Sequence, residues 1–130
     1  MKNVLSLFIV ILFFVSCTEN NQAIETTNYD DMKIRIAEIE IDSIHFDEYI
    51  AILKEEAANS VKSEEGVLCI YPMYQKDNPT QIRLLEIYEN DEAYQLHLKT
   101  DHFLYYKTTT LPMVKSLELI DIEAINRVVK

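Results

Sequence analysis

The sequence predicts one α+β domain with the element order β-α-β-β-α-β, in which helices cover one face of a four-stranded sheet. Apolar and polar residues alternate in a strand-like manner near both ends of the folding region, at 33–41 and 116–124. A helical apolar stripe follows the first of these segments, and two adjacent strand-like segments separate it from a second helical region. The folding region is long enough for one domain with one hydrophobic core.

The first strand and the first helix have clear sequence patterns. Residues 33–41, KIRIAEIEI, carry isoleucine at every second or third position, which suits a pleated strand. Asp42 or Ser43 can cap the next helix by accepting a backbone N–H bond. From Ile44 to about Ser63 the apolar residues recur at steps of three, four and seven, as on one helical face. They are Phe46, Tyr49, Ile50, Leu53, Ala57 and Val61.

The next two strands are predicted at 66–76 and 81–89, joined by a turn at 77–80, DNPT. Gly66 is the only glycine in the chain, and we expect it to supply the φ freedom needed to turn back into the sheet. Pro72 cannot donate a ladder hydrogen bond, which indicates an edge strand or a bulge.

The second helical region is predicted to be split in two. Asn90 caps a short helix with an acidic first turn, where the helix dipole favours negative charge. Thr100 is a second cap, with Asp101 as the first helical residue, and Pro112 lies near the end of this second helix. Residues 116–124 then form the last strand, which completes a ferredoxin-like order.

Both faces of the predicted sheet are partly apolar. Helices can cover only one face of such a sheet, and a monomer would expose the other as an apolar patch. We therefore expect a homodimer in which two sheets pack together. The alternating residues are Ile82 and Leu84 against Leu85 and Ile87, and Leu117 and Leu119 against Ile120 and Ile122.

Residues 1–16 resemble a lipoprotein signal peptide. The apolar run from Val4 to Val15 has the length of a signal-peptide core and is short for a membrane span. Ser16 precedes Cys17 as in a bacterial lipobox, and an ordinary secretory signal that contains a cysteine is the alternative. We expect lipidation of Cys17 and an exported bacterial lipoprotein, anchored to a membrane on the periplasmic side or at the cell surface.

Residues 17–31 are polar and acidic and predict a flexible tether before a domain at 32–123, with a C-terminal tail at 124–130. The chain has 12 basic and 22 acidic residues, a formal net charge of −10. This charge argues against binding nucleic acid or anionic headgroups, so that only the lipid would hold the protein at a membrane. Cys69 then has no disulfide partner in the chain and is expected to be a small buried hydrophobe.

Several motifs resemble the antibiotic biosynthesis monooxygenase (ABM) family over about residues 33–122. The most specific is H-x-x-T-x-H-F at 97–103, preceded by a strand that ends in E-x-Y at 86–88. The resemblance implies a dimeric α+β barrel. It also implies, for some members, oxidation of quinols or polycyclic phenols without a metal, a flavin or another bound cofactor. Further matching residues are Ser60, Glu64, Gly66 to Leu68, Ala93, Met113, Val114 and Ser116 to Leu119.

Two positions depart from the family pattern. Asp101 stands where members usually have Pro, and Asp is also acceptable in a first helical turn. Tyr88 stands where many members have Trp. Haem-degrading relatives use an Asn, Trp and His set, and this chain has no Trp, which argues against haem degradation.

His97 is the candidate catalytic residue. It lies four positions after Ala93 and could project into a pocket between helix and sheet. A neutral imidazole there could take a proton from a phenol and generate an electron-rich anion that reacts with O₂. A buried histidine hydrogen-bonded to the backbone is the structural alternative.

The candidate substrate-binding residues are Tyr88, Glu86, His102, Tyr106 and Tyr71. Tyr88 and Glu86 share one strand face, where Tyr88 could stack on an aromatic substrate and Glu86 could accept a hydrogen bond. His102 lies near a helix start, where the dipole favours a neutral ring, and could orient substrate or tie two helices together. Tyr106 and Tyr71 are candidates for the pocket wall.

We expect no metal site, because the five-residue spacing of His97 and His102 would set their rings well apart around a helix. The remaining lysines and glutamates are expected to form a solvated face. Three hypotheses remain for function. They are a cofactor-independent monooxygenase of a quinol or related aromatic compound, a non-oxidative binding or isomerising module, and a purely structural dimer.

Overall fold

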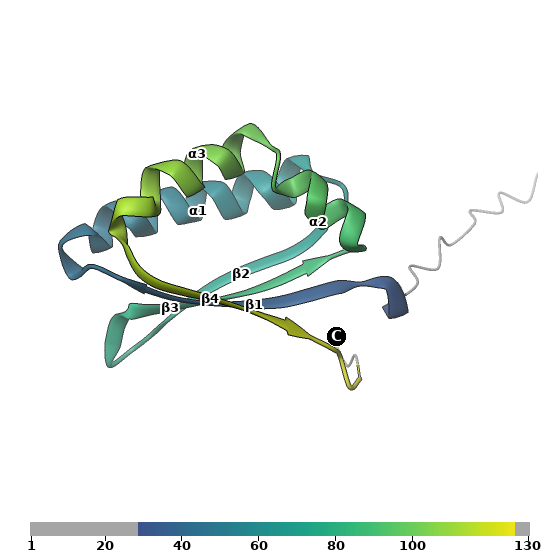
Figure 1. Cartoon of the computed structure of the whole chain (residues 1–130), viewed down its shortest axis with the longest axis horizontal. Coiled ribbons are helices and arrows are strands. Elements are labelled where there is room, and N and C mark those ends of the chain that lie inside the picture. The colour runs from purple at the N-terminus through teal and green to yellow at the C-terminus, as the bar shows by residue number, and fades with distance from the viewer. Residues whose placement is uncertain (1–28, 127–130) are drawn as a thin grey trace, which may run out of the picture.

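The computed structural model describes residues 29–126 and shows the predicted ferredoxin-like α+β fold (Figure 1). Four antiparallel strands form one sheet in the order β2-β3-β1-β4. The strands are β1 (Lys33–Ile41), β2 (Val67–Gln75), β3 (Asn78–Tyr88) and β4 (Val114–Ile122). The helices are α1 (Phe46–Ser63), α2 (Asp91–His97) and α3 (Asp101–Thr110), and short 3₁₀ turns lie at Tyr29–Asp31, Ser43–His45 and Leu111–Met113.

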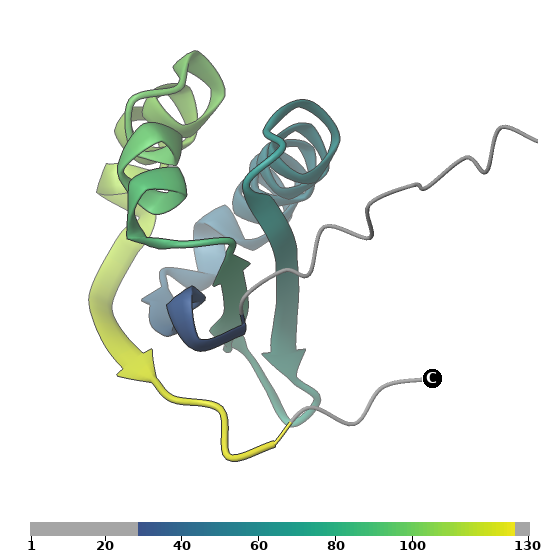
Figure 2. The same ribbon diagram turned by 90° about the vertical axis from the view of Figure 1, so that its right-hand side faces the viewer.

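All three helices lie on one face of the sheet, with α1 over the β2 side and α2 and α3 over the β4 side (Figure 2). The predicted signal peptide, Cys17, most of the tether and the end of the tail lie outside the described residues, so these expectations stay predictions. Between residues 29 and 126, no helix is both long and apolar enough to cross a membrane.

The buried face of α1 changes character along the helix. The predicted stripe is correct at Tyr49, Leu53 and Ala57, which are buried in the core. Val61 is 47% exposed, so its assignment to the stripe is wrong. This part of α1 also buries two polar residues beside Ala57, and they are Glu56 and Ser60. The first half of α1 therefore supplies apolar core alone, and the second half adds buried polar groups to it.

Gly66 is required for close packing and not for its backbone conformation. No described residue has a positive φ, so the expected use of glycine's φ freedom is wrong. A Cβ built on Gly66 would lie 2.5 Å from the Cβ of Ala93, well inside van der Waals contact. The carbonyl of Gly66 also accepts the backbone N–H of Glu89 at 2.9 Å. Glycine at this position lets α2 lie directly against the turn between α1 and β2.

Two strands are longer than predicted at their N-terminal ends. The turn between β2 and β3 occupies residues 76 and 77, and Gln75 pairs with Asn78. Pro79 is tolerated within β3 because the pairing with β1 reaches only to Gln81, so no partner there requires its N–H group. Similarly, β4 begins at Val114 and not at 116. Pro72 was predicted to lie on an edge strand or in a bulge, and it lies on the edge strand β2.

The helices cover one face of the sheet and leave the other face uncovered (Figure 2). Ala37, Ile39 and Ile41 of β1 face the helices and are buried. The opposite face, here called the open face, carries cross-strand rows in which β1 pairs with β3 on one side and with β4 on the other. The rows are Ile87–Ile34–Ile122 and Leu85–Ile36–Ile120. The predicted alternation in β3 is correct, and a second copy on the open face remains a prediction.

Candidate functional site

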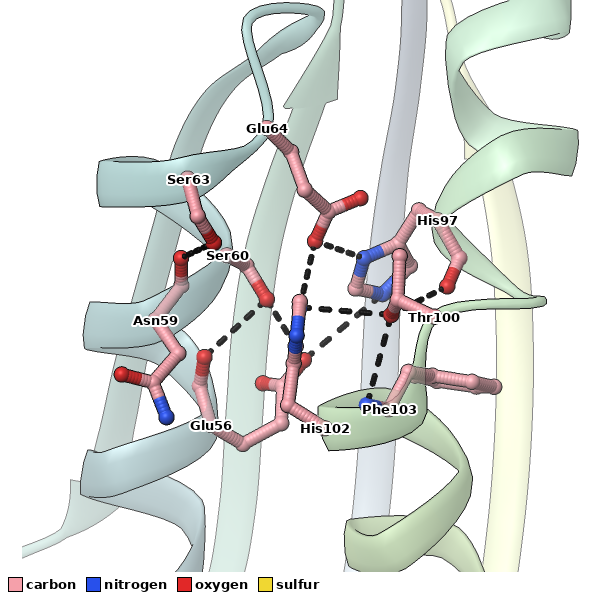
Figure 3. Close-up of polar contacts among 9 residues, drawn as sticks. All are labelled: Glu56, Asn59, Ser60, Ser63, Glu64, His97, Thr100, His102 and Phe103. Atoms are coloured by element: carbon pink, nitrogen blue, oxygen red, sulfur yellow. Dashed lines mark hydrogen bonds and ion pairs between the residues drawn. The ribbon is translucent and has the colours of Figure 1, made fainter.

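Two histidines and two glutamates form a buried polar group between α1 and the α2–α3 junction (Figure 3). We call Glu56, Glu64, His97 and His102 the His–Glu cluster. His97 is 2% and Glu56 is 5% exposed. The side chains of Glu64 and His102 are 12% and 22% exposed. The cluster therefore lies inside the protein and approaches the surface mainly through His102.

Thr100 brings the two histidines together by separating α2 from α3. Its hydroxyl donates to the carbonyl of His97 at 2.8 Å, and its oxygen accepts the backbone N–H of Phe103 at 3.4 Å as the N-cap of α3. The chain changes direction here, so His102 starts a new helix. The ring centroids of His97 and His102 lie 6.3 Å apart. The expectation that their spacing would keep the rings well apart is wrong, because it placed them around a helix.

Glu64 contacts both histidines through one carboxylate oxygen. Its Oε1 lies 3.0 Å from Nδ1 of His97 and 2.6 Å from Nε2 of His102. An ionised carboxylate can only accept, so both nitrogens donate to it. A neutral His97 then carries its proton on Nδ1 and presents the lone pair of Nε2 to the other side. Glu64 is itself held where α1 ends, because its backbone N–H donates to the carbonyl of Ser60 at 3.0 Å.

Glu56 lies on that other side of His97. Its Oε1 is 3.7 Å from Nε2 of His97, too far for a hydrogen bond, and accepts the hydroxyl of Ser60 at 2.8 Å. Burial raises the pKa of the Glu56 carboxyl, and the Ser60 hydroxyl and the nearby histidines oppose that rise. His97 is thus placed between two carboxyl groups of α1 and its C-terminal end.

Aromatic rings surround the imidazole of His97. The ring centroids of Phe103 and Tyr88 lie 4.7 Å and 5.4 Å from that of His97. Tyr88 is fully buried and also packs edge-on against Tyr94 at 5.2 Å. Among the described residues, its hydroxyl finds no hydrogen-bond partner, and burial raises its pKa. The structure therefore brings Tyr88 to His97, with one polar atom left unsatisfied.

Glu86 lies on the same strand face as Tyr88, and burial raises the pKa of its carboxyl to about 7. Two neighbours oppose this rise, the positive charge of Arg35 and the Tyr88 hydroxyl, which lies near the carboxyl without reaching hydrogen-bond geometry. Arg35 is engaged elsewhere, since its guanidinium donates to Asp121 at 2.9 and 3.0 Å and to the hydroxyl of Tyr94. Glu86 can therefore be a neutral acid at physiological pH.

The two candidate wall residues have different positions. Tyr106 lies on the inner side of α3, where its hydroxyl meets that of Tyr49 at 2.7 Å and its ring lies 6.4 Å from Phe103. Tyr71 pairs with Leu85 and lies on the open face, 61% exposed. The sheet separates Tyr71 from the His–Glu cluster, so its assignment to the pocket wall is wrong.

Sequence reasoning missed part of the cluster. Glu56 was expected on a solvated face, yet it is buried. Ser60 and Glu64 were noted only as matching residues, without a role. A usable signal was present, because Glu56, Ser60 and Glu64 follow one another at steps of four and continue the buried line of Leu53 along α1.

Two open grooves reach the cluster from outside. One, of about 280 Å³, lies between α1 and α3 and is lined partly by Glu56 and His102. The other, of about 400 Å³, lies at the turn between α1 and β2 and is lined partly by Glu64 and Thr100. His97 lines neither groove. Three cluster members thus border one of these two grooves, while His97 lies behind them, 2% exposed.

These features define a ferredoxin-like α+β domain with a buried histidine–carboxylate site between α1 and the α2–α3 junction. The chain belongs to the antibiotic biosynthesis monooxygenase family, whose sequence model matches residues 32–108. No curated protein matches the sequence.

Solved structures of several proposed monooxygenases are similar to this chain. One from Bacteroides thetaiotaomicron, assigned to antibiotic biosynthesis monooxygenases, is 40% identical, with a TM-score of 0.76, over 78% of this chain and 97% of that one. A proposed monooxygenase from Lactobacillus acidophilus is 32% identical, with a TM-score of 0.68, over 69% of this chain and 43% of that one. A protein from Nitrosomonas europaea, at 17% identity and a TM-score of 0.69 over 73% of this chain and 91% of that one, shows the shared fold alone.

Proposed function

We propose that the protein is a cofactor-independent monooxygenase that oxidises quinols or related aromatic compounds. The observation that carries the proposal is the contact between Nδ1 of His97 and Glu64 at 3.0 Å. It directs the lone pair of Nε2 away from Glu64, in surroundings formed by Tyr88 and Phe103. A base and an aromatic surface are what a phenolic substrate requires. Membership of the family supports this reading.

In this mechanism Nε2 of His97 accepts the proton of a substrate hydroxyl, and Glu64 stabilises the imidazolium that forms. The resulting phenolate is electron-rich and supplies the electrons that reduce O₂. For a simple quinol, one oxygen atom of O₂ enters the ring and the other leaves as water with two hydrogens of the substrate. The products are a hydroxyquinone and water, so no external reductant is consumed.

Oxygen uptake tests the proposal directly. The wild-type chain should consume O₂ with at least one member of a panel of quinols and polycyclic phenols, and label from ¹⁸O₂ should enter the product. His97→Ala should lower the rate on the order of 10²- to 10⁴-fold, the usual contribution of a general base. His45→Ala is the matched control, because His45 lies outside the cluster with its side chain 36% exposed. Absence of oxygen uptake with every substrate would refute the proposal.

A non-oxidative binding or isomerising module is the second candidate. It is favoured by the burial of His97, which is only 2% exposed and borders neither groove. Such a module would bind the same aromatic compounds, raise the melting temperature and leave the O₂ concentration unchanged. Thermal shift and oxygen uptake, measured on one ligand panel, therefore separate the two candidates.

We also propose that two copies pack through the open face, where Ile36 lies between Leu85 and Ile120. Burial of these rows would remove apolar surface from water. Sedimentation should give a two-chain mass for the wild type and a one-chain mass for Ile36→Glu. Val61→Glu, which adds the same charge to an exposed site on α1, should retain the two-chain mass. A wild-type monomer at micromolar concentration would exclude the dimer.

Anchoring by a lipid on Cys17 completes the proposal. Its support is the apolar segment that precedes Cys17 and the acidic composition of the chain, which disfavours adsorption on anionic lipid. The wild-type protein should fractionate with membranes of the producing bacterium, and Cys17→Ala should not. Cys69→Ser is the control for loss of a thiol elsewhere. A Cys17→Ala protein that remains with the membranes would rule out the lipid anchor.

A further inference from the structure

We propose that Glu56, His97 and His102 bind one divalent transition-metal ion. Each residue offers one ligand atom, and the three atoms all lie within 4.8 Å of one another. Metal–ligand bonds of about 2.0–2.2 Å place tetrahedral ligand atoms roughly 3.3 Å apart. The three side chains therefore need to converge by only about 1.5 Å. A His102 that ligates through Nε2 gives up the proton that it donates to Glu64, and the ion takes the place of that proton.

The donor set selects the class of metal. Two imidazole nitrogens and one carboxylate oxygen suit Zn²⁺, Co²⁺ and Fe²⁺, whereas Mg²⁺ and Ca²⁺ prefer sites made of oxygen alone. The three ligands come from three separate places, the middle of α1, the end of α2 and the start of α3. A bound ion would therefore join all three helices.

Two further contacts resemble the outer support of a metal site. Glu64 holds Nδ1 of His97 at 3.0 Å, which fixes the ring and leaves Nε2 facing Glu56. Histidine ligands in metal sites are commonly supported in this way by a carboxylate, which raises their basicity. The hydroxyl of Ser60 in turn holds Oε1 of Glu56 at 2.8 Å. Two of the three ligands are thus oriented by groups that need not touch the ion.

The site also has an entry path and a charge that a cation would balance. Glu56 and His102 line the groove of about 280 Å³ between α1 and α3, so an ion can enter there and keep a coordination position open to water. Two carboxyl groups are enclosed in the cluster, and buried charge is costly unless it is compensated. A divalent cation would supply that compensation.

The geometry of the site stands on its own, and its consequence for activity rests on the function proposed above. A metal at Nε2 of His97 occupies the lone pair that the oxidation uses as its base. Zn²⁺ should therefore inhibit quinol oxidation, and a chelator should restore it. The cluster would then act as a metal-sensitive switch on the same residues.

Direct binding of Zn²⁺ and Co²⁺ tests the site. The full chain, without a polyhistidine tag, is stripped with chelator, dialysed and titrated, with Zn²⁺ followed by calorimetry and Co²⁺ by its visible absorption. One equivalent should bind. His102→Ala and Glu56→Gln should each abolish this binding, and Glu64→Gln should weaken it about 10- to 100-fold, as loss of outer support does. His45→Ala and Cys69→Ser should bind as the wild type does.

The proposal is overturned if the wild-type chain binds neither ion, or if His102→Ala binds both as tightly as the wild type. Circular dichroism of each variant checks the fold. His102→Ala decides the matter if Glu56→Gln does not fold, because the side chain of His102 is 22% exposed and Glu64 keeps its contact with His97. Ions bound at His45 or at a thiol would be revealed by the two control variants.

Failure of the metal site and failure of the oxidation give different results. Oxygen uptake that is insensitive to Zn²⁺ and chelator, without a Co²⁺ spectrum, removes the metal site and leaves the oxidation. A Co²⁺ spectrum that depends on His102, without oxygen uptake, removes the oxidation and leaves the metal site.

Discussion

The hydroxyl of Thr100 donates a 2.8 Å hydrogen bond to the carbonyl of His97, so the residue that ends one helix is tied to the residue that caps the next. Thr100→Ala removes this bond and the cap of α3, and should lower the free energy of unfolding by about 0.5–2 kcal/mol. Thr108→Ala is the control, since its exposed hydroxyl only bonds carbonyls of its own helix, and its effect should stay within about 0.5 kcal/mol. Urea denaturation measures both, and equal midpoints would contradict the capping role.

The close approach of Gly66 to Ala93 predicts a strong penalty for any side chain at residue 66. Gly66→Ala places a Cβ 2.5 Å from that of Ala93, so α2 has to move, at a cost of about 1–3 kcal/mol. Ala93→Gly removes the clash at its own cost in helix propensity. In the double variant the two changes should therefore offset each other by at least about 0.5 kcal/mol. Strictly additive effects in urea denaturation would show that the contact is not the cause.

Two buried tyrosines should respond differently to loss of their hydroxyls. Tyr88→Phe removes a hydroxyl that has no partner among the described residues, so the protein should be unchanged or more stable by up to about 1 kcal/mol. Tyr49→Phe removes the 2.7 Å contact with Tyr106 and leaves that hydroxyl unsatisfied, which should cost about 1–3 kcal/mol. Thermal unfolding of the two variants tests whether the Tyr88 hydroxyl is unpaired, and a destabilised Tyr88→Phe would contradict this.

Glu86 should make stability depend on pH. Its pKa is raised from 4.5 to about 7 in the folded protein. The folded state therefore holds this proton more tightly, so the stability contribution is fully present below about pH 4.5 and is lost as pH rises through about 7. The span between these values corresponds to about 3 kcal/mol. Between pH 4.5 and 8, the free energy of unfolding of Glu86→Gln should therefore rise relative to that of the wild type by about that amount.

Comparing denaturation curves of the wild type and Glu86→Gln at each pH cancels the contributions of other titrating groups. Glu55→Gln supplies the control, because Glu55 is an exposed glutamate on α1, away from the open face. It should follow the wild type at every pH. A constant difference between Glu86→Gln and the wild type from pH 4.5 to 8 would show that the carboxyl keeps its ordinary pKa.

Local patterns in the sequence were sufficient to predict the order of the elements. Alternation identified β1 and β3, and the caps Asn90 and Thr100 predicted where α2 and α3 begin, because capping depends on residues only a few positions apart. The role of Gly66 could not be read in this way. The atom that excludes a side chain there belongs to Ala93, and only the folded chain brings the two together.

The site was predictable only in part for the same reason. His97 and Tyr88 were both predicted to serve one pocket, and their ring centroids lie 5.4 Å apart. The burial of Glu56 was missed because a glutamate on a helix is usually solvated, and the side chain that covers it, His97, belongs to α2. The position of Tyr71 was missed because a one-residue step along β2 decides which face a side chain occupies.

The break at Thr100 also affects how the site can open. Helices of seven and ten residues are too short to persist alone in water, so the segment 91–110 depends on its contacts with α1 and the sheet. Its amides should exchange hydrogen faster than those of the 18-residue α1. Local unfolding of this segment would carry His97 and His102 away from the carboxylates of α1 and admit solvent to them. The cluster thus joins α1 to the two short helices, and opening of those helices would expose it.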